Sequence, residues 1–245
     1  MVRTPVLRLA ATLLLASAAT AGSASAQVLY NNGPAVDGGL SVLRASGNTL
    51  GFGAQILNSN RVADDFSVAG ANWNVSGFSF FAYQTGAAGA FTFTGLNWSV
   101  IAGDVNTGSV VASGSGAPTN GGLAGYRVTS TTLTNTSRAI FQLDLDVADF
   151  MLGAGSYWLT WSIDGTVASG PWQPPTADGV VGNAHQSING GAFNQAIDSG
   201  DQLGAELPFL VRGTRMASVP EPGSIALLLT GGVALLGVVR RRRSV

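Results

Sequence analysis

Few residues of this chain have the type and setting of catalytic groups. His185, in the segment GNAHQS, is the single histidine among 245 residues, so a multi-histidine metal site is excluded. His185 could act on a serine such as Ser187, but no serine lies in the G-x-S-x-G pattern of a nucleophile elbow. We therefore interpret His185 as a hydrogen-bonded residue of a loop or strand edge, and we assign no catalytic residue.

The carboxylates are the next candidates. Asp144 and Asp146 alternate with apolar residues and Asp149 follows them, so oxygen ligands for Ca²⁺ could gather there. No EF-hand or glycine–aspartate repeat accompanies them, and a solvated strand face explains the pattern. Asp64 differs because it shares the parity of Phe66 and falls on an apolar face. A buried carboxylate needs donors, so Asp64 is either a structural group or a contact for Ca²⁺ or another ligand. We assign no metal site and no cofactor.

Two tryptophans could contact a ligand. Trp172 lies in the segment SGPWQPP, whose prolines predict a stiff, exposed loop. Trp158 lies opposite the apolar face of its predicted strand. Exposed aromatic faces can stack on sugars, although such residues also pack loops against a domain. Trp172, Trp158 and Asp64 are therefore the candidate ligand contacts of the body.

The C-terminal segment has three parts. A linker, 217–222, contains Pro220, Glu221 and Pro222; an apolar segment, 223–239, follows; and a basic tail, 240–245, contains the arginines 240–243. The apolar segment reaches the lower limit of about 17 residues for a bilayer-spanning helix, and the arginines should stay cytoplasmic. The two prolines hold Glu221 in an extended, accessible stretch at the membrane face. The pattern predicts a short transmembrane helix that presents a processing motif.

The N-terminal segment 1–26 has the layout of a secretory signal peptide. Arg3 and Arg8 precede a run rich in leucine and alanine, which ends in small residues at Ala24-Ser25-Ala26. This pattern predicts cleavage by signal peptidase before Gln27. An uncleaved membrane helix is the alternative, but the apolar run is short. The body, 27–216, is therefore expected to be exported across the inner membrane.

The charge of the body excludes some partners. The whole chain has 12 basic and 13 acidic residues, but six arginines lie in the terminal segments. The body has six arginines, no lysine and twelve acidic residues, so its net charge is −6. We expect no nucleic-acid partner, because cations that meet phosphates supply most of that affinity. The chain contains no cysteine, which excludes disulfides and thiolate metal sites.

Alternating hydrophobicity predicts strands throughout the body. The segments IFQLDLDV and SYWLTWSID each place apolar residues on one face. The alternation shifts phase near Thr94-Gly95 and again between Phe80 and Phe81, which predicts two bulges or bends. Further strands are expected at VLYNNG, RVADDFSV, GSVVASG, GYRVTS and LPFLVRG.

The strand pattern predicts the fold class. The chain contains 34 glycines, and pairs such as Gly121-Gly122 and Gly190-Gly191 mark turns between the strands. No stretch of the body has sustained helical periodicity. We expect an all-β domain, a single antiparallel β-sandwich of about ten short strands with a jelly-roll-like topology, and a closed barrel is the alternative.

The tail resembles a known sorting signal. Val219-Pro220-Glu221-Pro222, the apolar segment and Arg240–Arg243 are similar to the PEP-CTERM signal of exported bacterial proteins. The resemblance covers about the last 27 residues of the chain. It implies that an exosortase, a membrane-embedded cysteine transpeptidase-like protease, recognises and removes the tail. Hosts of this family are typically Gram-negative bacteria that make exopolysaccharide or biofilm matrix.

The body also resembles uncharacterised domains found with such tails, in segments such as ADDFSV, FTFTGLNWSVIAGD and LPFLVRG. This second resemblance implies a shared domain but no established activity. Three functions are therefore open. The leading hypothesis is a non-enzymatic surface or extracellular-matrix protein associated with exopolysaccharide. The alternatives are a carbohydrate-binding module that uses Trp172 or Trp158, and a secreted hydrolase that uses carboxylates.

Overall fold

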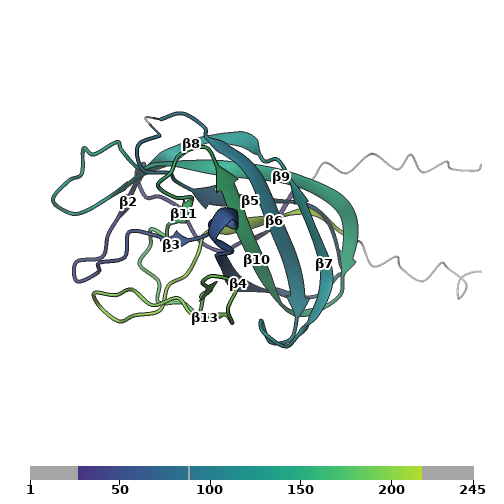
Figure 1. The fold of residues 1–245 in the computed structure, drawn as a ribbon. Helices are drawn as coiled ribbons and strands as arrows, with labels where there is room; N and C mark the ends of the chain where they lie inside the picture. Colours follow the sequence, from purple (N-terminus) through teal and green to yellow (C-terminus); the bar gives the residue numbers. More distant parts are fainter. Residues whose placement is uncertain (1–26, 88, 217–245) are drawn as a thin grey trace, which may run out of the picture.

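A computed structural model describes residues 27–87 and 89–216 and shows an all-β body (Figure 1). The strands are β1 (Gln27–Asn31), β2 (Leu40–Val42), β3 (Phe52–Gly53), β4 (Arg61–Val68), β5 (Trp73–Ala82), β6 (Phe93–Ala102), β7 (Ser109–Gly116), β8 (Thr119–Val128), β9 (Ala139–Leu152), β10 (Gly155–Gly165), β11 (Trp172–Gln173), β12 (His185–Ser187), β13 (Asn194–Gln195) and β14 (Phe209–Arg215). A 3₁₀ helix, η1 (Ile56–Asn58), lies between β3 and β4.

Several predicted features lie outside the described residues. They are the signal peptide 1–26 with Ala24 and Ala26, the motif Pro220, Glu221 and Pro222, the segment 223–239, and Arg240, Arg241, Arg242 and Arg243. Gln27, the predicted first residue after cleavage, begins β1. Within 27–87 and 89–216, none of the helices has the length and apolar character needed to cross a membrane.

Two six-stranded sheets form the body. One sheet has the order β1-β14-β5-β9-β8-β2, and the other has the order β13-β12-β4-β10-β6-β7. A two-stranded sheet pairs β11 with β3. The described pairings between strands are antiparallel except that of β2 with β8, which is parallel. The prediction of an all-β, antiparallel body is confirmed, and the arrangement is consistent with a β-sandwich.

Aromatic side chains from both sheets fill one core. Phe80 of β5 contacts Trp161 of β10, with ring centroids 5.2 Å apart. Phe78 of β5 contacts Trp98 of β6 in the same way, at 5.0 Å. These pairs join the facing sheets, and large rings bury the most apolar area per residue. The core therefore depends on contacts between strands that are distant in the sequence.

The alternating segments form the predicted strands. RVADDFSV is β4, and SYWLTWSID lies within β10. In β9, Leu143 and Leu145 enter the core, while Asp144 and Asp146 point to the other face. The body forms strands here because period-two hydrophobicity gives each strand one face to bury.

One of the two predicted phase shifts is correct. The pairing of β6 with β10 shifts at Thr94, because Phe93 pairs with Gly165 and Gly95 pairs with Asp164. The prediction of a shift between Phe80 and Phe81 is wrong, since the register of β5 with β9 is continuous there. β5 is instead buried on both faces: Phe80 belongs to the main core and Phe81 to a second hydrophobic cluster.

The chain enters and leaves the body at one end of the sheets. Gln27 pairs with Gly213, and Arg215 pairs with Trp73, the first residue of β5. The loops around β2, β3 and β11 gather near the other end of β5, as Figure 1 shows. Ten residues of extended strand span roughly 30 Å, so the loop end lies far from the point where the tail begins.

The aromatic core predicts a large effect of one substitution. Phe80→Ala should lower the free energy of unfolding by about 3–5 kcal/mol, because it leaves a cavity between the sheets. Leu57→Ala is the control, since that side chain is 89% exposed and should change stability by about 0.5 kcal/mol or less. Urea unfolding followed by tryptophan fluorescence measures both values, and equal effects would contradict this description of the core.

Candidate functional site

The loop end carries an open pocket of about 370 Å³, here called the Trp172 pocket. Its lining residues come from four separate parts of the chain: Asn48, Thr49, Leu50, Gly51, Tyr83, Thr85, Arg138, Ser169 and Trp172. Tyr83 directly follows β5, and Arg138 directly precedes β9. The two central strands of one sheet therefore position two of its side chains.

Trp172 is held in place by backbone pairing and by packing. Its N–H donates to the Tyr83 carbonyl at 2.9 Å, and its carbonyl accepts from the Tyr83 N–H at 3.0 Å. Trp172 also pairs with Gly53 in the β11–β3 ladder. The indole is partly buried against the second hydrophobic cluster, which includes Phe81 and Ile140. The loop is therefore less exposed than its prolines predict, because tertiary packing covers part of the ring.

Two glycines keep this region open. Gly170 has a φ of +116°, which L side chains rarely adopt, and an added Cβ would lie 2.8 Å from Cδ1 of Trp172. A Cβ on Gly51 would lie 2.8 Å from Oη of Tyr83 and 3.1 Å from Cβ of Trp172. A side chain at either position would displace the aromatic rings that border the pocket.

The polar lining combines a phenol, hydroxyls and one cation. Burial raises the pKa of Tyr83 to about 12, although Arg127 and Arg138 oppose the rise, so its hydroxyl is neutral at physiological pH. Thr85 and Ser169 add further hydroxyls to the lining. Nη1 of Arg138 is shielded from solvent and has no hydrogen-bond partner. This lining suits a ligand with many hydroxyl groups and an apolar ring face.

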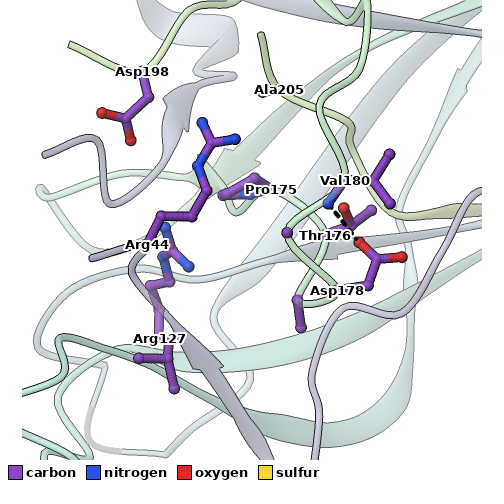
Figure 2. A pocket seen from close by; sticks show the side chains of 11 residues that line it. Arg44, Arg127, Pro175, Thr176, Asp178, Val180, Asp198 and Ala205 are labelled. Atoms are coloured by element: carbon purple, nitrogen blue, oxygen red, sulfur yellow. Dashed lines mark hydrogen bonds between the residues drawn. The ribbon is translucent and has the colours of Figure 1, made fainter. Parts of the chain in front are cut away.

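A group of charged residues supports the pocket from behind; we call Arg44, Arg127, Asp198 and Asp201 the loop clamp. Figure 2 shows Arg44, Arg127 and Asp198 beside a smaller cavity of about 120 Å³, with Thr176 and Asp178 on its other side. Arg127 is buried and donates to the carbonyls of Leu50 and Thr49. Burial lowers the pKa of Arg127 to about 10, which leaves it protonated at neutral pH.

The carboxylates of the loop clamp hold the same loop. Asp198 accepts from the backbone N–H groups of Asn48 and Thr49, at 2.8 and 3.1 Å. These bonds favour its charged form, and the pKa of Asp198 lies below its usual value, although partial burial opposes that shift. Arg44 pairs with Asp201, with Nε and Oδ2 2.9 Å apart. The charged groups of the loop clamp therefore bind other groups of the same chain, and they fix Asn48, Thr49 and Leu50, which line the Trp172 pocket.

Asp64 lies inside the body between the chain segments that enter and leave it. Its Oδ2 accepts from Nδ2 of Asn32 at 3.0 Å and from the N–H of Leu207 at 2.7 Å. Its Oδ1 accepts from the N–H of Asp65 at 2.9 Å. Burial raises the pKa of Asp64 to about 8, and the neighbouring Glu206 adds to the rise. The donors to Asp64 are two backbone N–H groups and the Asn32 amide, and these contacts favour the structural interpretation of Asp64.

Trp158 and His185 lie together on the other sheet. Their rings meet edge to face, with centroids 4.8 Å apart, and Trp158 packs against Phe193. His185 Nδ1 lies 2.8 Å from the carbonyl oxygen of Asn183. Ser187 donates to the carbonyl of Gly191, so the imidazole is not its hydrogen-bond acceptor. His185 is therefore a hydrogen-bonded residue, as predicted, but it lies in β12, which pairs with β4 on one side and β13 on the other, and not in a loop or at a sheet edge.

The other candidate carboxylates, Asp144, Asp146 and Asp149, belong to β9. Asp144 accepts from Oγ of Ser79 at 2.6 Å, and Asp146 lies 3.5 Å from Nη2 of Arg212. Asp146 and Asp149 also line a second open pocket of about 410 Å³, where Trp98 and Phe150 supply aromatic surface. Across 27–87 and 89–216, the structure contains no group of three or more histidine, aspartate or glutamate residues arranged to hold a metal ion.

Sequence patterns indicated only part of the Trp172 pocket. Trp172 stood out because prolines surround it, whereas Tyr83 and Arg138 lie in segments without a motif. These residues meet because β5 and β9 are neighbours in one sheet and β11 pairs with Tyr83. No local spacing could reveal that convergence.

The comparisons with known proteins identify the tail. Residues 218–243 match the PEP-CTERM protein-sorting motif, so the resemblance of the tail is confirmed. The motif supports an exported protein that an exosortase sorts to the cell envelope or surface. No curated protein and no solved structure matches the chain. The function of the body must therefore be argued from its own residues.

The environment of Asp64 predicts a dependence of stability on pH. A carboxyl whose pKa is higher in the folded state binds more protons when folded. Its contribution to stability is therefore complete below its ordinary value of 3.8 and is lost as the pH rises towards about 8. In Asp64→Asn this titration is absent. Urea unfolding from about pH 4 to about pH 8 should show wild type losing stability relative to the variant. A difference that stays constant with pH would contradict the assignment.

Proposed function

We propose that this protein is a non-enzymatic surface or extracellular-matrix protein whose β-body associates with exopolysaccharide through the Trp172 pocket. The observation that carries this proposal is the pocket itself, in which Trp172, whose backbone pairs with that of Tyr83, borders hydroxyl groups and an arginine. Sugars present apolar ring faces together with hydroxyl groups, and an amphipathic aromatic lining complements both.

The position of the pocket supports this role. The sorting motif, 218–243, follows directly after the described body, which ends beside Trp73. The Trp172 pocket lies near the other end of β5. While residues 223–239 anchor the unprocessed protein as a transmembrane helix, the pocket would face away from the membrane, where secreted polysaccharide is found. After processing, the same pocket would hold the body in the matrix.

The pocket lining favours binding over hydrolysis. Glycoside hydrolysis normally uses a pair of aspartate or glutamate side chains that flank the scissile bond. The described residues that line the Trp172 pocket include neither type. We therefore propose a binding function for this site and not a hydrolase.

The same proposal includes a jelly-roll sandwich as the fold of the body. Strands β1-β14-β5-β9 form one four-stranded set and strands β4-β10-β6-β7 form the other. The chain passes between these sets repeatedly, which supports two interlocked Greek keys. Signal peptidase would remove residues 1–26 and leave Gln27 at the start of β1.

Polysaccharide binding should depend on one tryptophan. On a glycan array, Trp172→Ala should lose most of the wild-type signal, because the variant lacks the ring that borders the pocket. Trp158→Ala is the matched control, since that indole packs against Phe193 on the other sheet and should leave binding unchanged. Loss of signal in Trp158→Ala with retention in Trp172→Ala would place the ligand elsewhere.

Processing gives a second test. Intact-mass analysis of the protein from its native host should show a chain that begins at Gln27 and lacks the arginines 240–243. Substitution of Glu221 by alanine should cause the unprocessed form to accumulate, because the exosortase motif is altered. A mature wild-type species that retains Arg240 to Arg243 would contradict sorting by tail removal and would indicate a permanent anchor.

A further inference from the structure

We propose that the Trp172 pocket selects an anionic saccharide, with Arg138 as the cation that receives the carboxylate or sulfate group of the sugar. This inference rests on the proposed glycan binding and adds the chemical class of the ligand.

Arg138 lacks a counter-ion among the described residues. Among the residues that the structure describes, the ion pairs join Arg44 to Asp201 and Arg212 to Asp144 and Asp146, so Arg138 takes part in none. One of its guanidinium nitrogens, Nη1, is shielded from solvent without an acceptor. A shielded donor without an acceptor is costly, particularly on a charged group. A ligand anion in the pocket would supply the missing acceptor once the side chain turns its Nη1 towards the ligand.

The charged side chain in the lining of the Trp172 pocket is positive. The body has a net charge of −6, yet the described lining of the Trp172 pocket contains Arg138 and no carboxylate. Behind it, the buried guanidinium of Arg127 donates to oxygens of Leu50, Thr49 and Ser41. The two arginines of the loop clamp are balanced by Asp198 and Asp201, so Arg138 adds a positive charge that the clamp does not offset. The pocket is therefore a cationic position on an acidic protein, which attracts an anionic ligand and disfavours a cationic one.

The pocket beside Trp98 and Phe150 differs from the Trp172 pocket in its charged residues. The pocket beside Trp98 and Phe150 also offers aromatic surface, but its polar lining includes Asp146 and Asp149. Carboxylates there would repel an acidic sugar. The Trp172 pocket and the pocket beside Trp98 therefore differ in the sign of their charged lining, and of these two the Trp172 pocket suits an anion.

The side chains also divide the recognition between them. Trp172 is partly exposed and offers aromatic surface to the sugar ring, while Thr85 and Ser169 offer hydroxyls to its hydroxyl groups. Tyr83 is buried and forms part of the pocket wall. The planar guanidinium of Arg138 can bind both oxygens of a carboxylate at once, which an ammonium group cannot do with the same geometry. Specificity for an acidic sugar would therefore depend on Arg138 more than on the aromatic residues.

Calorimetric titration of the protein purified from its host tests this inference. The probes are an oligogalacturonate, a sulfated oligosaccharide of similar length, and the fully methyl-esterified, neutral form of the oligogalacturonate. Wild type should bind at least one of the charged probes about tenfold or more tightly than the neutral form. Arg138→Gln should remove this preference, and Arg138→Lys should restore it only in part.

Arg61→Gln provides the matched control, because it removes the same charge from a different site, beside Phe193. Its preference for the charged probe should equal that of wild type. Circular dichroism and thermal unfolding confirm that each variant is folded. The charged-probe preference of wild type should also weaken as salt is raised.

The outcomes separate the two proposals. Equal affinity of wild type for charged and neutral probes overturns the anion inference and leaves glycan binding in place. A charged-probe preference that survives Arg138→Gln overturns the assignment to Arg138. If wild type binds none of the three probes but does bind neutral glycans on an array, the anion inference is also overturned. Failure to bind glycans in both assays overturns the proposed function.

Discussion

Burial of β5 on both faces is the constraint on which the rest of the structure depends. One face carries Phe78 and Phe80, which contact Trp98 and Trp161 of the opposite sheet and so join the two layers. The other face carries Phe81, whose cluster receives the indole of Trp172. One strand therefore links the core to the pocket. Close packing of this kind leaves side chains little conformational freedom, so the pocket residues are held in a preformed arrangement.

Sequence patterns predicted the strands well where one face is buried and the other is solvated. RVADDFSV and IFQLDLDV fall within β4 and β9 because period-two hydrophobicity is sufficient there. The pattern misled at Phe80 and Phe81, since a strand buried on both faces no longer alternates. The short strands β2 and β3 were not predicted, because they form through pairing with distant segments. The pocket also forms through contacts between distant segments. Its sequence pattern marks Trp172, whereas Arg138 joins the pocket because β9 lies beside β5.

The distribution of charge connects export, sorting and binding. Six of the twelve arginines lie in the two terminal segments, and the C-terminal segment carries the PEP-CTERM sorting motif. The exported body has no lysine and few arginines, most of which are held by carbonyls, hydroxyls or carboxylates. Arg138 is unusual because it borders an open pocket without a carboxylate partner. The body has few charged residues and a net negative charge, so an arginine in this position supports the proposed anion site.

The most direct measurement is an NMR titration that follows the indole N–H signals of the five tryptophans. These residues sample the core, both sheets and the loop end, so each signal reports on a different region. Addition of an oligogalacturonate should shift the Trp172 signal in a saturable manner, while the signals of Trp98 and Trp158 remain in place. A shift of Trp98 or Trp158 with an unchanged Trp172 signal would contradict the account.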